Sequence, residues 1–137
     1  MRVKCVANDV HKLRSRELQE RLGRSIRLDG ADDDLHIGES YDVFVLRESD
    51  GGLWVLLDTV PQSDHPYPYP LEMFDVVDAS IPEDWSIGFE RRAHGTTMTS
   101  VGFSEWVKDA TFYERLLDRE PDALAIWERQ RLKRSIK

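Results

Sequence analysis

The feature that most constrains the fold is a pair of apolar runs joined by a short polar segment rich in glycine. In the first run, over residues 41–46, Tyr, Val and Val alternate with Asp, Phe and Leu, and the second run covers residues 53–57. Alternation of this kind is typical of β-strands. The connecting Ser49-Asp50-Gly51-Gly52 contains the residue types that adopt the positive φ angles of tight turns. A β-hairpin is therefore predicted at residues 41–57.

Other segments carry weaker but related patterns. Strands are predicted over residues 2–7, 73–77 and 85–89, and the proline-rich segment 61–70 is expected to run extended, because proline cannot donate to a sheet ladder. Asn8 or Asp9 can cap a helix over residues 10–22, which Gly23 can end. Residues 93–100 are expected to form a loop.

Beyond this loop the apolar spacing becomes helical. A short helix is predicted around Trp106, a second after Asp109, and a third from Pro121, because proline is favoured at the first helical position. The 137 residues fit one domain. The predicted fold is α+β: residues 1–92 form a five-stranded antiparallel barrel or strongly bent sheet with a surface helix at 9–22 inserted after the first strand, and residues 93–137 form two or three packed helices.

Charge divides the chain into three blocks. Residues 29–90 contain 16 Asp or Glu residues but a single basic residue, Arg47, whereas residues 1–28 and 91–137 carry net charges of +5 and +3. The formal net charge is −7. Because the acidic block coincides with the best strand patterns, the carboxylates are expected on the outside of a folded β unit that faces something positive.

Composition narrows the setting. Cys5 is the only cysteine, so no intrachain disulfide can form, and it is predicted to be a small buried residue on the first strand. The chain opens on a polar stretch, and its longest apolar block, residues 53–57, is too short to cross a bilayer. We expect a cytoplasmic protein that does not bind membranes.

Two segments, YPYPLEMFDVVDASIPEDW and GFSEWVKDATFYERLLDREPDALAIWE, resemble a set of small bacterial proteins that pair an SH3-like β-barrel with C-terminal helices. The similarity spans residues 37–128, and some of these proteins look like immunity proteins that neutralise toxins used between bacteria. It implies an SH3-like form for the barrel and carries no catalytic residue. The chain departs from the pattern in its Arg-rich first helix and its Asp32-Asp33-Asp34 loop. The resemblance rests on aromatic, apolar and turn positions: Pro70, Phe74, Val77, Asp78, Pro82, Trp85, Gly102, Phe103, Val107, Phe112, Tyr113 and Leu116.

These observations favour a non-enzymatic binding protein that occludes a basic protein partner such as a toxin. Acidic side chains would speed the encounter with a cationic partner, and aromatic contacts would set the lifetime of the complex. Trp54 alternates away from its apolar neighbours, and Tyr67 lies on a proline-rich edge, so both are candidate anchors. The other tryptophans, Trp85, Trp106 and Trp127, are expected in the core. The predicted steering charges are Asp32, Asp33, Asp34, Glu48 and Asp50.

Two other functions remain open from the sequence. His65 and His94 could join Asp64 in an acid–base or metal site, although the histidines lack the close spacing of metal ligands. Nucleic-acid binding would require the basic segments 10–27 and 129–137 to form one patch directed away from the acidic face. A third arrangement, in which the basic segments neutralise the acidic unit within the fold, needs no partner at all. No phosphate loop, nucleophile elbow or dinucleotide fingerprint is present, and no cofactor is expected.

Overall fold

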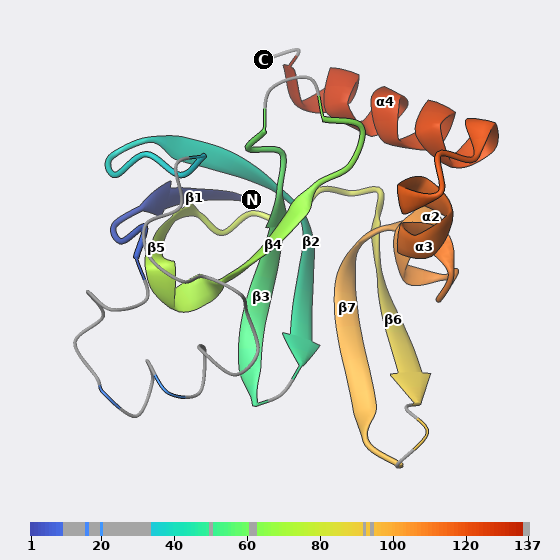
Figure 1. Cartoon of the computed structure of the whole chain (residues 1–137), viewed down its shortest axis with the longest axis horizontal. Coiled ribbons are helices and arrows are strands. Elements are labelled where there is room, and N and C mark those ends of the chain that lie inside the picture. Colours follow the sequence, from blue (N-terminus) through green and yellow to red (C-terminus); the bar gives the residue numbers. More distant parts are fainter. Residues whose placement is uncertain are drawn as a thin grey trace.

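The computed structural model describes residues 1–9, 16, 20, 34–49, 51–60, 63–91, 93 and 95–135. The architecture is α+β, with a seven-stranded sheet and three helices at the C-terminal end of the chain (Figure 1). The strands are β1 (Arg2–Cys5), β2 (Ser40–Ser49), β3 (Gly52–Leu57), β4 (Tyr67–Pro70), β5 (Phe74–Asp78), β6 (Trp85–Arg91) and β7 (Thr97–Phe103). The helices are α2 (Ser104–Val107), α3 (Phe112–Leu117) and α4 (Pro121–Ser135), and a 3-10 turn, η2 (Leu71–Met73), joins β4 to β5.

The ten-residue strand β2 organises the sheet. Its first residues pair with β1, its later residues pair with β7, and β3 runs along its other edge. The strand order is β4-β3-β2-β1-β5, with β6 outside β7, and every pair is antiparallel. The register shifts between Val43 and Val45. Such bulges bend a strand, and the bend lets β2 serve two neighbours on the same edge.

The pairings among the described residues do not close into a ring. β4 pairs only with β3, β5 only with β1, and β6 only with β7, so each of these three strands is an edge. Residues 67–70 were expected to be extended at an edge, and β4 confirms this. A proline-containing strand suits this place because its free side needs no amide donors.

The core joins the sheet to the helices. Val3, Val55 and Met73 are fully buried on or beside the strands. Toward the helices, Phe44 of β2 meets Trp127 of α4 edge-on, with ring centroids 4.6 Å apart. Phe103, at the end of β7, contacts Trp106, Phe112 and Trp127 at centroid distances of 5.9, 5.8 and 6.4 Å. Because Phe103 touches all three helices, the end of β7 anchors them to the sheet.

Local chemistry explains where the helices begin and end. α4 begins at Pro121, as predicted, and Lys133 and Arg134 in its last turn complement the helix dipole. α3 ends in a Schellman motif: the amides of Arg119 and Glu120 donate to the carbonyls of Leu116 and Arg115, each at 3.0 Å. Arg119 takes the left-handed conformation that this motif requires, with φ of 59°.

The structure confirms the α+β class, the hairpin of β2 and β3, the strands β1, β5 and β6, and the three C-terminal helices. Cys5 is buried on β1, as predicted. Two predictions were wrong. The sheet has seven strands and not five, and the expected loop over residues 93–100 overlaps β7, so that the helices begin only after Phe103. Thr97, Thr99 and Val101 are β-branched residues that favour a strand, and Gly95, with φ of 91°, supplies the turn before it.

The predicted helix over residues 9–22 lies outside the described residues, apart from Asp9, Arg16 and Glu20. Within the described ranges, none of the helices combines the length and apolarity needed to cross a bilayer.

Candidate functional site

The basic ends of the chain fold back onto the acidic middle. Arg131 of α4 binds Asp58 at 2.9 Å, and Lys133 binds Asp84 at 3.2 Å. Two further carboxylates of residues 29–90 are paired in the same way, Asp42 with Arg2 at 3.1 Å and Asp64 with Arg119 at 2.6 Å. Neutralisation of the acidic block by the basic segments within the fold therefore accounts for part of its negative charge. It also engages two basic residues of the segment 129–137 that a nucleic-acid patch would need.

Other carboxylates of the acidic block are left over. They are exposed and make no ion pair with the described part of the chain. These residues are Glu39, Glu48, Asp75 and Glu83.

The leftover carboxylates do not form one patch. Asp75 and Glu39 lie on either side of β1. Lys4 of β1 is opposite Asp75 of β5 on one side and opposite Ser40 of β2, the residue after Glu39, on the other. Glu48 lies near the opposite end of β2. Because a strand rises roughly 3.3 Å per residue, Glu39 and Glu48 are up to roughly 30 Å apart along β2. The negative charge is thus spread over the surface of the sheet.

Of the predicted steering charges, Glu48 is exposed on β2, and Asp34 is half-buried in a turn before β2. Asp32, Asp33 and Asp50 lie outside the described residues. The structure therefore places Glu48 as an available charge and leaves the predicted cluster untested.

Trp54 is not the exposed anchor that its alternation indicated. Its side chain is only 6 % exposed, because residues 54–57 of β3 are buried on both faces of the sheet. Tyr67 is half-buried on β4 and its ring lies against His65, with centroids 4.7 Å apart. Tyr67 is opposite Leu57, whereas Trp54 is opposite Pro70, so the two aromatic residues occupy opposite ends of the β3–β4 pair. They do not line one groove.

The remaining tryptophans confirm the core prediction. Trp85, Trp106 and Trp127 are all buried. Arg134 of α4 lies over the Trp85 ring, 5.7 Å from its centroid. This cation–π contact ties the end of α4 to the start of β6.

The surroundings of Asp64 and His65 do not support the predicted acid–base or metal site. The Asp64 carboxylate is bound to Arg119, and the His65 ring lies against Tyr67 and Tyr113, with the Tyr113 centroid 6.3 Å away. His94 lies outside the described residues. No group of three or more His, Cys, Asp or Glu side chains in the described ranges is arranged to hold a metal ion.

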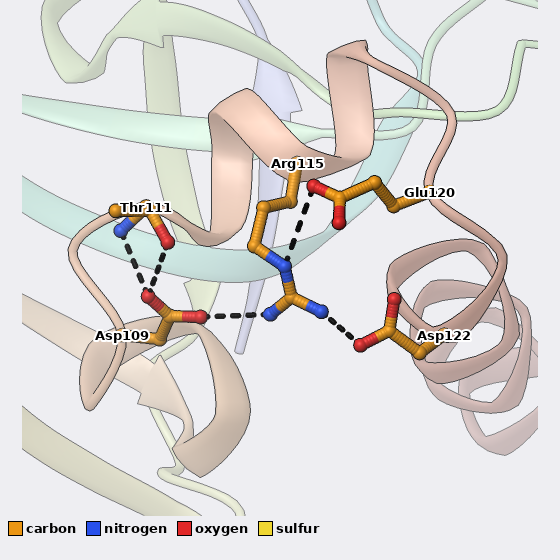
Figure 2. Close-up of polar contacts among 5 residues, drawn as sticks. All are labelled: Asp109, Thr111, Arg115, Glu120 and Asp122. Atoms are coloured by element: carbon orange, nitrogen blue, oxygen red, sulfur yellow. Dashed lines mark hydrogen bonds and ion pairs between the residues drawn. The ribbon is translucent and has the colours of Figure 1, made fainter.

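A polar cluster at the joint of the three helices was not foreseen. Figure 2 shows Arg115 of α3 between three carboxylates: Asp109 at 2.9 Å, Glu120 at 3.5 Å and Asp122 in close contact. The hydroxyl and amide of Thr111, together with Arg115, hold the pKa of Asp109 below its usual range. Arg115 likewise lowers the pKa of Asp122. The cluster links the loop before α3 to the start of α4, so its role is structural.

The β6–β7 hairpin has one covered and one uncovered face. On the covered face, a Cβ placed on Gly88 would lie 2.1 Å from the carbonyl oxygen of Val107, and the hydroxyls of Ser86 and Ser104 are 2.7 Å apart, so α2 lies directly against β6. A cavity of about 160 Å³ remains beside α2, with Arg47, Trp106 and Tyr113 in its wall. The other face carries exposed apolar side chains. Nothing in the sequence indicates which of the two faces is covered.

We call the side of the β6-β7-β2-β3 ladder that carries Ile87 and Phe89 the open face. It is defined by these residues: Leu46, Glu48, Leu53, Ile87, Phe89, Thr99 and Val101.

Comparison with protein-family models, curated proteins and solved structures gives no match for this chain. The surface described above therefore has to be interpreted from its own chemistry.

Proposed function

We propose that this protein is a non-enzymatic acidic binding protein, an immunity protein that neutralises a basic bacterial toxin in the cytoplasm by occluding its active surface. The observation that carries the proposal is the set of exposed carboxylates, Glu39, Glu48, Asp75 and Glu83, that remain after the terminal segments have neutralised their neighbours. Folding leaves these charges in water. They are available to a cationic partner.

The proposed mechanism separates encounter from retention. A formal charge of −7 spread over the surface attracts a cationic protein from a distance and raises the association rate, and salt screens this attraction. Close contacts of apolar side chains then determine how slowly the complex dissociates. This division predicts that salt acts mainly on association.

We also propose that strands β1 to β5 form a partly open, SH3-like barrel. The order β4-β3-β2-β1-β5, the long β2 shared between two sets of partners, and the 3-10 turn between β4 and β5 support this assignment. The resemblance of residues 37–128 to immunity-like proteins of that form supports it as well. A barrel offers a rigid scaffold that keeps its exposed charges in place before a partner arrives.

A first experiment uses the gene adjacent to the one that encodes this chain. If that gene encodes a basic toxin, its product should stop growth when expressed alone, and coexpression of this chain should restore growth. Failure to restore growth, with both proteins produced, would count against the immunity role.

A second experiment measures association directly by stopped flow. Reversing three exposed charges, Glu39→Lys, Glu48→Lys and Asp75→Lys, should slow association with the toxin about 10-fold or more at low salt. The matched control, Glu39→Asp, Glu48→Asp and Asp75→Glu, preserves every charge and should leave the association rate unchanged. An association rate that is insensitive to the reversals and to salt would exclude electrostatic steering.

A further inference from the structure

The strand register places side chains of four strands on one face. Ile87 of β6 lies opposite Val101 of β7, and Val101 lies opposite Leu46 of β2. Residues directly opposite in an antiparallel pair point to the same side of the sheet. These three residues therefore form one apolar row, which is covered at its β3 end because Leu46 lies opposite the fully buried Val55.

A second row runs parallel to the first. Phe89 lies opposite Thr99, Thr99 opposite Glu48, and Glu48 opposite Leu53 of β3. With neighbouring strands about 4.8 Å apart, this row is about 14 Å long. Its order is apolar, small polar, acidic and apolar.

The outer apolar side chains of this face are exposed, whereas Leu46 and Val101 between them are half-buried against the core. Phe89 is 75 % exposed and Ile87 is 60 % exposed, the two highest values among the large hydrophobic residues that the structure describes. Leu53, at the far end of the second row, is 40 % exposed. Exposed apolar side chains gathered on one face commonly mark a contact surface.

The charge within the face indicates what covers it. Glu48 is exposed and makes no ion pair with the described part of the chain. Covering this carboxylate with an apolar surface would remove its hydration without replacement, which is strongly unfavourable. A partner that brings a Lys or Arg to Glu48 avoids that loss. Arg91, exposed at the end of β6, disfavours a second cation on its side of the face.

We propose that the open face is the docking surface for a basic amphipathic segment of a partner protein. In this complex the segment lies across the strands, places apolar side chains on Ile87, Phe89 and Leu53, and directs one Lys or Arg to Glu48. The inference rests on the proposed function, since it takes the cationic partner from there. To the proposed function it adds the surface of this protein that contacts the partner.

The test uses two synthetic amphipathic peptides and needs no natural partner. Both have a leucine face, and they differ only in a central residue of that face, Lys in one and Glu in the other. Isotope-labelled protein is titrated with each peptide and followed by backbone amide chemical shifts. The Lys peptide should shift amides of β6, β7 and the second half of β2, and the Glu peptide should bind about 5-fold more weakly or worse.

Variants test the two parts of the face separately. Phe89→Ser should weaken binding of the Lys peptide about 10-fold or more, since it removes a large apolar contact. Glu48→Gln should reduce the difference in affinity between the Lys and Glu peptides. The control Ile81→Ser removes a side chain that is 55 % exposed but lies in the β5–β6 connection, off the open face, and should leave binding unchanged.

Each contrary outcome has a distinct meaning. Salt-sensitive binding of the Lys peptide at another surface would overturn the docking face and leave the proposed function standing. Absence of binding by cationic peptides even at low salt would count against both. Shifts of β6 that depend on protein concentration alone would show that a second copy of the chain occupies the face, and would overturn the assignment of a basic partner.

Discussion

A single residue at the end of α3 holds an unfavourable backbone conformation. Arg119 has φ of 59°, a value that costs a residue with a Cβ about 1–2 kcal/mol. Its side chain is 71 % exposed and its ion pair with Asp64 contributes little. We expect Arg119→Gly to raise the free energy of unfolding by up to about 1 kcal/mol, measured by urea denaturation.

The matched control is Arg129→Gly, in the interior of α4. Arg129 is also exposed and also forms an ion pair, with Glu105 at 3.1 Å. There glycine should lower the free energy of unfolding by about 1 kcal/mol, because it gains nothing from a helical φ. Equal effects of the two substitutions would show that the left-handed conformation of Arg119 carries no strain.

Another residue-scale prediction concerns Gly88. A Cβ at this position would lie 2.1 Å from the backbone oxygen of Val107, and backbone yields less readily than a side chain. Gly88→Ala should therefore lower the free energy of unfolding by about 1–3 kcal/mol as α2 is pushed from β6. The neighbouring substitution Ile87→Ala, on the open face, should change it by less than about 1 kcal/mol. If Gly88→Ala left the free energy of unfolding unchanged, this result would contradict the close contact between α2 and β6.

At the scale of elements, the cluster around Arg115 predicts a response to acid. Asp109 and Asp122 have lowered pKa values in the folded state, so their stabilisation is complete above the unfolded value of about 3.9 and is lost as the pH falls toward the folded values. Thermal denaturation between pH 6 and pH 2 should show the loss. In Arg115→Gln the midpoint should be lower at pH 6 and should fall less on acidification. A parallel pH profile for the two proteins would mean that Arg115 does not hold these carboxylates.

At the scale of the whole molecule, one core couples sheet and helices. Trp127 of α4 is 1 % exposed and touches both Phe44 of β2 and Phe103 of β7. Trp127→Ala should lower the free energy of unfolding by about 3–5 kcal/mol, a large fraction of the total for a domain of this size. Trp127→Phe should lower the free energy of unfolding by less than Trp127→Ala does. Far-ultraviolet circular dichroism and tryptophan fluorescence should report a single transition in the wild type. Separate transitions for sheet and helices would contradict a shared core.

Local patterns in the sequence were sufficient to predict most elements. Alternation located β2 and β3, the Asp-Gly-Gly turn joined them, and Pro121 marked the start of α4. These features act within a few residues, so they can be read without knowledge of the fold. β7 was missed because the strand-forming residues Thr97, Thr99 and Val101 follow a polar stretch, and only pairing with β6 and β2 makes them a strand.

The site was harder to predict because the exposure of a side chain depends on which other elements of the fold cover its face of the sheet. Alternation separates two faces of a strand but does not say which face is covered. Trp54 was expected outside and is buried, because residues 54–57 of β3 are covered on both sides, whereas Phe89 is open because α2 lies only on the other face of β6.

The sequence alone determined most of the elements and the division into basic ends and an acidic middle, since these depend on composition and on neighbours along the chain. Only the tertiary structure decided which charges remain free. Arg131 neutralises Asp58 from 73 residues away, whereas Glu48 makes no such pair with any residue that the structure describes. Ion pairs form between side chains that folding brings within about 4 Å, and that proximity is a property of the folded chain.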